Sequence, residues 1–454
     1  MRSLHFEHAL LPDGWRRNVR IVLEGDLIAR VEPDCVPSPD DFRAGHALPG
    51  MPNLHSHAFQ RGMAGLSERR TRVDDSFWSW REIMYRFLDR MTPEDVEAVS
   101  AQAYVEMLES GFTRVGEFHY LHNDIDGRPY ADPAELAARI AAAAVETGIR
   151  LSLLPCFYAH GDFGGAAALP GQRRFLNSLD SYARLLESCE RMAASLAGAT
   201  VAVAPHSLRA VDPAELVRLM ELAGDRPVHM HIAEQTGEVD ACIAWSGLRP
   251  VEWLLRHVPV DHRWCLIHAT HMTMSETNDL AATGCIVGLC PMTEASLGDG
   301  IFPGEAWRLA GGRIGIGTDS NILIGVAEEL RALEYGQRLD TRRRNVMADA
   351  PNASTGASLF AASLAGGAAA LGVVQPALAP GMPADIVGLA ADAACFAAED
   401  AAVLSDCWIF GGSRHDVGDV WCGGHHVVEH GRHVAADAVL QRYRKSVRRL
   451  AAGS

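Results

Sequence analysis

The pattern of hydrophobic and polar positions changes near residue 49. From there on, short runs rich in β-branched and apolar residues alternate with longer segments whose apolar residues recur at helical spacing, such as 93–111, where Gly111 is expected to end the helix. Repeated strand–helix units predict a parallel sheet, and eight of them predict a closed (β/α)8 barrel. The eight runs span 48–57, 113–120, 149–158, 200–207, 227–234, 264–269, 285–291 and 313–320.

Both ends of the chain have a different pattern. Residues 1–48 alternate apolar and polar positions around turn signals, and strand-like alternation returns in 376–435. We therefore expect an α/β protein in which a small β-sandwich, built from 1–48 and 376–435, flanks a catalytic barrel over 49–375. Residues 436–454 are expected to form a basic helix and tail.

Composition narrows the possible partners. The chain has 454 residues, 48% of them hydrophobic, and a formal net charge of −16. An acidic protein is a poor match for nucleic acid or for an anionic membrane surface, and the longest uncharged stretch, 351–384, is too weakly apolar to span a bilayer. The ten cysteines occur singly, and the N-terminus lacks a sustained apolar segment. These features predict a cytoplasmic protein with reduced thiols and no signal peptide.

Lysine is almost absent, and this restricts the chemistry. Lys445 is the only lysine among 41 lysines and arginines, and it lies close to the C-terminus. Schiff-base catalysis is therefore disfavoured, and neither a P-loop nor a metal pair bridged by a carboxylated lysine is available. The 20 histidines favour metal binding or general acid–base catalysis instead.

Polar residues recur at the carboxyl ends of the predicted strands. In a parallel barrel these ends meet at one face, where the active sites of such barrels lie. A single histidine at such a position is commonly structural, but several that converge on one rim favour a site. The residues concerned are His55, His57, His119, His206, His231, His268 and Asp319.

Four of these residues form a plausible ligand set for a metal ion. His55 and His57 are two positions apart, so on a continuing strand both side chains point to the same face. His231 and Asp319 would complete a set of three imidazoles and one carboxylate. Such a set suits Zn²⁺, with Fe²⁺ or Mn²⁺ as alternatives, and a catalytic site must also keep a position open for water.

His229 competes with His231 for this role, because the two lie on the same face of one predicted strand. We favour His231 because Glu234 follows three residues later, where the strand turns into a loop. That spacing would place a carboxylate beside the metal-bound water. The alternative for Glu234 is an acidic residue in the first turn of a helix.

Taken together, these residues resemble the amidohydrolase superfamily, and the resemblance extends over essentially the whole chain. NLHSH, HIAE, HATH and GTDSN follow the first, fifth, sixth and eighth predicted strands as in its mononuclear deaminase branch, and GMPADIVGL resembles the return into its β-sandwich. Within that branch the chain is most similar to the formimidoylglutamate deiminases. The closer similarity lies in HSHAFQRGMAG (55–65), DSFWSWRE (75–82), GEFHYLH (116–122) and APHSLRAV (204–211).

One segment departs from the nucleobase and chlorotriazine deaminases. After the seventh strand those enzymes usually carry Pro-x-Ser-Asn, whereas this chain has CPMTEASLGDG. The difference disfavours guanine, cytosine or adenosine-type substrates.

The resemblance implies a mechanism. Zn²⁺ would be held by His55, His57, His231 and Asp319, and Asp319 would also accept a proton. His268 would hydrogen-bond the hydroxide or the tetrahedral centre, and Glu234 would pass a proton to the departing nitrogen. The reaction would convert N-formimino-L-glutamate to N-formyl-L-glutamate and ammonia in histidine degradation. The alternatives are another deaminase for an anionic amidine or aryl-amine, and a non-catalytic scaffold of this fold.

A small dicarboxylate substrate needs cationic partners. Arginine forks match carboxylates. Arg81 and Arg209 lie in predicted loops that follow the first and fourth strands, although each could instead be a solvated surface charge. Trp78 and Trp80 are expected to pack this region rather than to touch ligand. The resemblance implies a homodimer. Neutral hydrogen bonds to the substrate are expected from Gln60, Tyr120 and His206.

Overall fold

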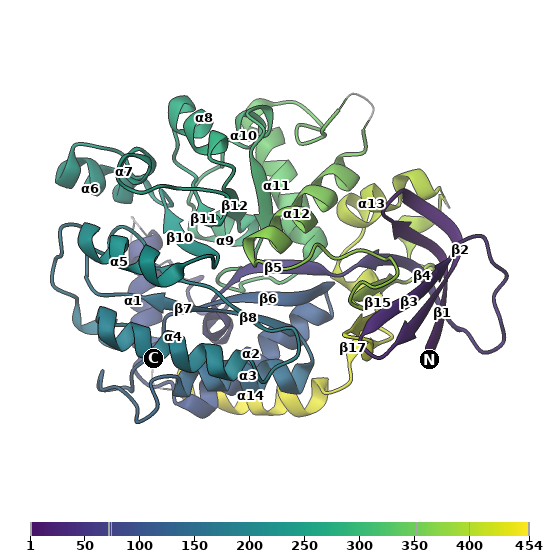
Figure 1. The fold of residues 1–454 in the computed structure, drawn as a ribbon, viewed down its shortest axis with the longest axis horizontal. Coiled ribbons are helices and arrows are strands. Elements are labelled where there is room, and N and C mark those ends of the chain that lie inside the picture. The colour runs from purple at the N-terminus through teal and green to yellow at the C-terminus, as the bar shows by residue number, and fades with distance from the viewer. Residues whose placement is uncertain (1, 71–72, 74, 351–352, 399, 453–454) are drawn as a thin grey trace.

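A computed structural model describes residues 2–70, 73, 75–350, 353–398 and 400–452. It contains the predicted parallel barrel, whose strands are joined mostly by helices (Figure 1). The α/β barrel fold expected from the sequence is confirmed. The barrel strands are β5 (Met51–Ser56), β6 (Phe112–His119), β7 (Arg150–Phe157), β8 (Thr200–Val201), β9 (Ala204–Pro205), β10 (Val228–Ile232), β11 (Trp264–His268), β12 (Ile286–Leu289) and β13 (Arg313–Ile316).

Two parallel sheets make up the barrel wall. One runs β5-β6-β7-β8, with β9 also paired to β7, and the other runs β10-β11-β12-β13. Isolated bridges join the two sheets at both seams: Ser56 pairs with Asp319 at one, and Val203 pairs with Val228 and Ser207 with His231 at the other. Because Asp319 and His231 belong to these seams, closing the barrel brings residues that are distant in sequence to the same rim.

Helices surround the barrel, and several begin with capping residues that the sequence supplies. Thr92, Asp212 and Thr273 each accept a hydrogen bond from the backbone N–H three residues later. The helices are α1 (Phe77–Leu88), α2 (Pro93–Leu108), α3 (Glu135–Thr147), α4 (Leu179–Ala193), α5 (Pro213–Ala223), α6 (Thr236–Ser246), α7 (Pro250–His257), α8 (Met274–Ala282), α9 (Pro291–Leu297), α10 (Gly304–Leu309), α11 (Val326–Thr341) and α12 (Thr355–Ala370).

Two local expectations need correction. Helix α2 ends at Leu108 with Glu109 as its C-cap, so Gly111 does not cap it; instead Gly111 has a φ of 98° and leads into β6. The stretch 75–82 is not a plain loop. From Phe77 it forms α1, which starts with a reciprocal capping pair between Ser76 and Ser79.

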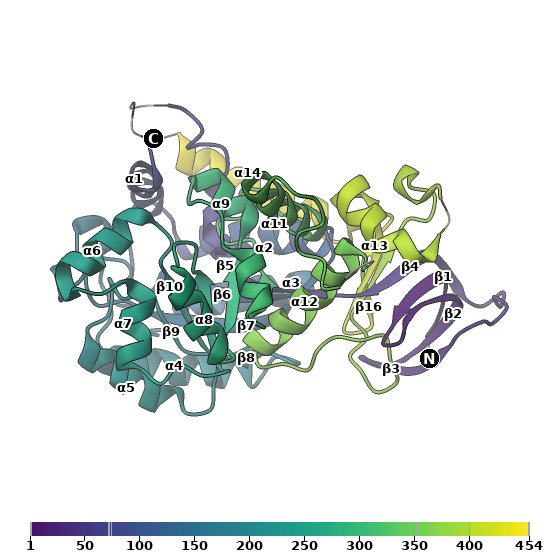
Figure 2. The ribbon, with the colours of Figure 1, turned by 90° about the horizontal axis from the view of Figure 1, so that it is seen from above.

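The flanking domain uses both ends of the chain, as expected. Figure 2 shows β1 to β4 and β16 together at one end of the molecule. The strands form one mixed sheet in the order β17-β16-β15-β14-β4-β1-β2-β3, in which β14 pairs antiparallel with β4. Its strands are β1 (Arg2–Leu11), β2 (Gly14–Glu24), β3 (Leu27–Glu32), β4 (Phe42–Pro49), β14 (Ile386–Leu389), β15 (Val417–Cys422), β16 (His425–Glu429) and β17 (Arg432–His433). The short helix α13 (Leu404–Asp406) lies between β14 and β15.

The last helix, α14 (Ala436–Ala451), returns to the barrel and packs against α2 (Figure 1). Ion pairs tie it there: Arg442 binds Glu146 and Arg449 binds Asp95. Among the described helices, none has both the length and the apolar character needed to cross a lipid bilayer.

The barrel interior below the rim is packed solid. Leu54 is fully buried, and glycines on neighbouring strands leave room for it. A Cβ atom at Gly116, Gly288 or Gly315 would lie 2.6 Å or less from an atom of Leu54. The rim residues therefore stand on a rigid base, as a preorganised site requires.

Candidate metal centre and active site

The candidate site lies where the barrel strands end. His55 belongs to β5, His57 follows it, and His231 belongs to β10. The chain bends sharply at this rim, because His268 and Asp319 have φ values of 69° and 43°. Residues other than glycine are rare in this left-handed region, where each costs on the order of 1–3 kcal/mol, and such residues cluster at functional sites.

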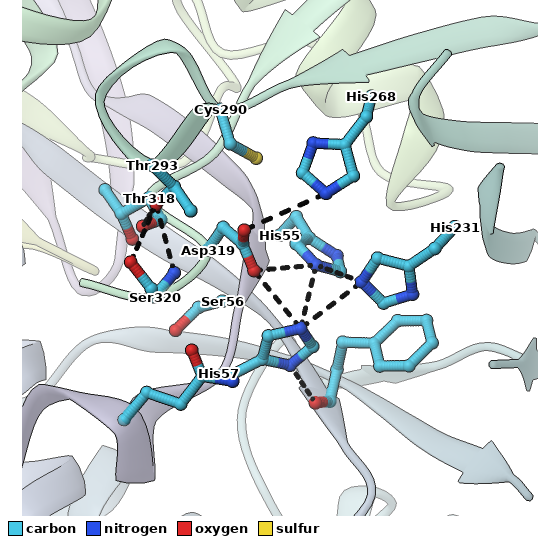
Figure 3. Close-up of polar contacts among 12 residues, drawn as sticks. His55, Ser56, His57, His231, His268, Cys290, Thr293, Thr318, Asp319 and Ser320 are labelled. Atoms are coloured by element: carbon cyan, nitrogen blue, oxygen red, sulfur yellow. Dashed lines mark hydrogen bonds and ion pairs between the residues drawn. The ribbon is translucent and has the colours of Figure 1, made fainter. Parts of the chain in front are cut away.

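Four side-chain atoms converge on one point (Figure 3). The Nε2 atoms of His55 and His57 are 3.2 Å apart, those of His57 and His231 are 3.3 Å apart, and those of His231 and His55 are 3.1 Å apart. Asp319 Oδ1 lies 3.4 Å from His55 Nε2 and 3.2 Å from His57 Nε2. Four ligands at 2.0–2.1 Å from a tetrahedral ion are separated by about 3.3 Å, so this spacing fits a metal centre.

The hydrogen bonds of the imidazoles show why a cation belongs there. His57 Nδ1 donates to the carbonyl of Phe118 at 2.8 Å, and His231 Nδ1 donates to that of His206 at 3.0 Å. The protons therefore sit on Nδ1, and the Nε2 lone pairs face each other. Burial also lowers the pKa of His55, His57 and His231, which keeps the rings neutral. A metal ion bound by these four side chains would relieve the repulsion between the lone pairs.

His229 does not join this cluster. Its Nε2 donates to the carbonyl of Ala370 at 2.7 Å, at the end of α12. The ring is fully buried and is held by that hydrogen bond. His231, and not His229, therefore faces the ligand atoms of His55, His57 and Asp319.

A second group of polar side chains borders the metal cluster. His268 Nε2 lies 3.8 Å from Glu234 Oε1 and 3.8 Å from Asp319 Oδ2, and its Nδ1 lies 3.2 Å from Glu294 Oε1. Burial alone would lower the pKa of His268, but the surrounding carboxylates outweigh it and raise the pKa. Burial raises the pKa of Glu234 despite its cationic neighbours. The site thus holds a carboxyl group able to carry a proton near neutral pH.

A pocket opens over these residues and contains every predicted substrate contact. Gln60 lies in a short 3-10 turn at Ala58–Met63, and its side-chain Nε2 donates to Tyr120 Oη at 2.7 Å. Its side-chain oxygen, Oε1, has no hydrogen-bond partner among the described residues. The lining residues are His57, Gln60, Phe77, Trp80, Arg81, Met84, Tyr85, Tyr120, Tyr158, Phe175, His206, Arg209, His231, Glu234, His268, Leu297 and Asp319.

Both predicted arginines reach this pocket and lie near one tryptophan. The guanidinium carbon of Arg81 is 4.5 Å from the ring centre of Trp78, and that of Arg209 is 5.8 Å from it. Arg209 is 8% exposed, its Nε has no partner among the described residues, and the nearest carboxylate oxygen, on Glu234, is 3.9 Å away. A buried arginine without a close carboxylate favours binding of an external anion.

Several residues differ from the sequence expectation. His119 ends β6 but does not line the pocket, because the alternation of side chains along the strand turns Phe118 toward the histidines and His119 away. Trp80, expected only to pack, lines the pocket. Tyr85, Tyr158 and Phe175 were missed. Helical spacing after Arg81 could have pointed to Tyr85, and Tyr158 ends the predicted strand run 149–158.

Comparisons with known proteins agree with this geometry. The Amidohydrolase family matches residues 46–427, and the N-terminal domain of formimidoylglutamate deiminase HutF matches residues 1–45. The formimidoylglutamate deiminase of Pseudomonas aeruginosa is 48% identical over 439 residues, which cover 96% of this chain and 97% of that protein.

Solved structures show the same fold. An amidohydrolase from Brucella melitensis superposes with a TM-score of 0.95 at 54% identity, covering 99% of this chain and 100% of the other. A zinc-bound adenosine deaminase from Xanthomonas campestris has a TM-score of 0.82 at 22% identity over 99% of this chain and 98% of its own. On the extent of the family match, this chain belongs to the amidohydrolase family.

Proposed function

We propose that this protein is a zinc-dependent deiminase that hydrolyses N-formimino-L-glutamate to N-formyl-L-glutamate and ammonia, a step of histidine degradation. The observation that carries the proposal is the content of one pocket. It joins His57, His231 and Asp319 of the buried four-residue cluster to Arg81 and Arg209, and among the described residues the carboxylate oxygen nearest to Arg209 is 3.9 Å away. The 48% identity to a formimidoylglutamate deiminase supports the same reaction.

The substrate has two ends with different chemistry, and the pocket matches both. We assign the two glutamyl carboxylates to Arg81 and Arg209, whose guanidinium groups can each donate two parallel hydrogen bonds to a carboxylate. Gln60, Tyr120 and His206 line the same pocket and offer neutral hydrogen bonds. The formimino carbon would then lie beside the metal cluster.

The ligand set fits Zn²⁺ best, because three neutral imidazoles and one carboxylate at tetrahedral spacing suit a d¹⁰ ion without a strong geometric demand. Fe²⁺ and Mn²⁺ are the alternatives. When bound, such an ion supplies Lewis-acid activation of water near neutral pH.

The protein's own residues then handle the protons. Asp319 Oδ2, which faces His268, accepts the proton that the attacking water loses. His268 Nε2 hydrogen-bonds the attacking oxygen as the formimino carbon turns tetrahedral. Glu234, whose pKa burial raises, delivers a proton to the departing nitrogen. The C–N bond to the imino nitrogen breaks, ammonia leaves, and the added oxygen becomes the formyl carbonyl.

An ammonia-release screen tests the proposal directly. Purified metal-loaded protein is offered N-formimino-L-glutamate, N-formimino-L-aspartate and guanine at equal concentrations. We expect the highest kcat/KM for the glutamate compound. A higher value for the aspartate compound would reassign the substrate to a shorter dianion, and release from guanine alone would refute the deiminase assignment.

Location and assembly complete the proposal. We propose a cytoplasmic location, in keeping with the single cysteines, none of which is paired in a disulfide. We also propose a homodimer, which the family resemblance implies. Light scattering coupled to size-exclusion chromatography should give a mass of twice the 49.0 kDa chain. A mass of one chain would contradict the dimer.

A further inference from the structure

The segment after β12 departs from the Pro-x-Ser-Asn stretch of related deaminases, and the structure shows what its residues contact. It forms α9, whose Leu297 lines the pocket while Glu294 lies behind His268 and outside the lining. We infer that Glu294 is a positioning residue that fixes the ring of His268, and this inference rests on the function proposed above.

Contacts of the Glu294 carboxylate carry the inference. Its Oε1 accepts a hydrogen bond from His268 Nδ1 at 3.2 Å and another from the backbone N–H of Cys290 at 2.9 Å. Because a carboxylate can only accept, the Nδ1 of His268 is the protonated nitrogen on that side. The other nitrogen, Nε2, is thereby turned toward Glu234 and Asp319, each 3.8 Å away, where the reacting atoms would lie.

The helix that carries Glu294 is itself fixed to the metal site. Thr293 Oγ1 donates to the carbonyl of Thr318 at 3.1 Å and accepts from the backbone N–H of Ser320 at 3.2 Å, on either side of the metal ligand Asp319 (Figure 3). Glu294 is 6% exposed and His268 is fully buried. Two consecutive residues of α9 therefore fix the position of His268 relative to that of Asp319.

His268 needs such a support because of its backbone. Its φ of 69° and that of Ala269, 47°, place two consecutive residues in the left-handed region. His268 Nε2 has no hydrogen bond to a described residue, so Nδ1 is the only ring nitrogen that holds the imidazole. Removal of that acceptor leaves the ring free to turn away from the reacting atoms.

A double-mutant cycle tests this role. Glu294→Gln keeps a side-chain oxygen for Nδ1–H and Cys290 but removes the charge, and Glu294→Ala removes both. We expect both variants to keep their full metal content and a KM within about twofold of the unaltered protein. Their kcat should fall about 10- to 100-fold, and the fall should be larger for Glu294→Ala than for Glu294→Gln. In a His268→Gln background, the added Glu294→Gln change should alter kcat by less than about twofold.

Glu329→Gln is the matched control. Glu329 is also fully buried and its Oε2 also accepts a backbone N–H near the start of α9, that of Met292 at 2.9 Å, but no contact joins it to His268. Equal loss of kcat from Glu294→Gln in both backgrounds, or a kcat unchanged by either Glu294 variant, would overturn the inference.

A second readout does not depend on turnover, so it separates this inference from the proposed function. In ¹⁵N-histidine-labelled protein, the downfield ring N–H signal that disappears in His268→Gln reports the bond to Glu294. We expect it to move upfield in Glu294→Gln and to stay in place in Glu329→Gln. An unmoved signal refutes the positioning role, whereas failure to release ammonia from N-formimino-L-glutamate refutes the proposed function.

Discussion

The Nε2 atoms of His57 and His231 lie 3.3 Å apart, although 174 residues separate them in the chain. Neither nitrogen can donate to the other, because each ring donates its proton from Nδ1, His57 to the carbonyl of Phe118 and His231 to that of His206. Two buried lone pairs at this distance repel each other unless a cation lies between them. The first prediction therefore concerns the metal.

His231→Gln should lower the bound metal well below one ion per chain, because it removes one of four ligands. The matched control is His229→Gln, since glutamine can still donate to the Ala370 carbonyl that His229 contacts. That variant should keep one ion per chain by elemental analysis. The reverse pattern would exchange the roles of the two histidines.

Removal of the metal from the unaltered protein should lower its Tm. A metal ion that binds only the folded chain stabilises it, and the apo protein would keep the facing lone pairs of His57 and His231. Differential scanning calorimetry before and after chelation, and again after adding Zn²⁺, measures the effect. An identical Tm in all three samples would contradict a metal site at this cluster.

Glu234→Gln should retain metal and KM but lose kcat by roughly 10²-fold or more, because glutamine cannot carry the proton to the leaving nitrogen. The carboxyl group of Glu234 lies in the pocket and outside the four-ligand cluster. Ammonia release at saturating substrate measures kcat, and elemental analysis provides the control. Loss of metal with unchanged kcat per bound ion would instead identify Glu234 as a ligand.

Arg81→Met and Arg209→Met should each weaken kcat/KM for the dianionic substrate by on the order of 2–5 kcal/mol, because a desolvated carboxylate would lose its partner. A neutral N-alkylformamidine should lose much less, since it presents no carboxylate. The difference between the two substrates is the measurement. Equal losses on both would mean that the arginines maintain the structure of the pocket wall.

Arg86 provides the control for these two variants. It lies on α1, the helix that carries Arg81, but at an exposed position outside the pocket lining. Arg86→Met should change neither substrate by more than about 1 kcal/mol, as expected for a solvated charge. A selective loss on the dianion from this variant would point to long-range attraction and not to direct binding.

His122 should make the fold less stable in mild acid. Burial lowers its pKa to about 4, while its Nε2 donates to the carbonyl of Cys156 at 2.8 Å. In the unfolded chain the ring takes up a proton near pH 6.5, so its contribution is fully present above pH 6.5 and is lost as the pH falls toward 4. Between pH 7 and pH 5 the loss is about 2 kcal/mol.

Urea unfolding at pH 7 and pH 5 measures this effect. His122→Gln keeps a donor for the Cys156 carbonyl but does not titrate, so its stability should depend less on pH than that of the unaltered protein. His262→Gln, at an exposed position, is the control and should behave like the unaltered protein. The same pH dependence in all three proteins would show that His122 is protonated without penalty.

The sequence was informative where one local rule decides the outcome. Alternating strand and helix periods predicted the barrel, and the i, i+2 spacing of His55 and His57 placed both rings on one face. Asp319 and Glu234 could be singled out because they end strand runs, and strand ends of a parallel barrel share one rim. A position on the rim does not, however, say which way a side chain points.

That direction was decided by tertiary contacts. His119 also ends a strand, yet it turns away from the pocket. His229 shares a strand face with His231, but its Nε2 donates to the carbonyl of Ala370, 141 residues away in the chain. Trp80 and Phe175 reach the pocket from segments without a diagnostic spacing.

The amino-acid order by itself determined the fold class and the kinds of side chain at the rim, because hydrophobic period and strand ends are local properties. Only the closed barrel decided which of those side chains meet, because the seam pairings of Ser56 with Asp319 and of Ser207 with His231 join segments that are far apart in sequence.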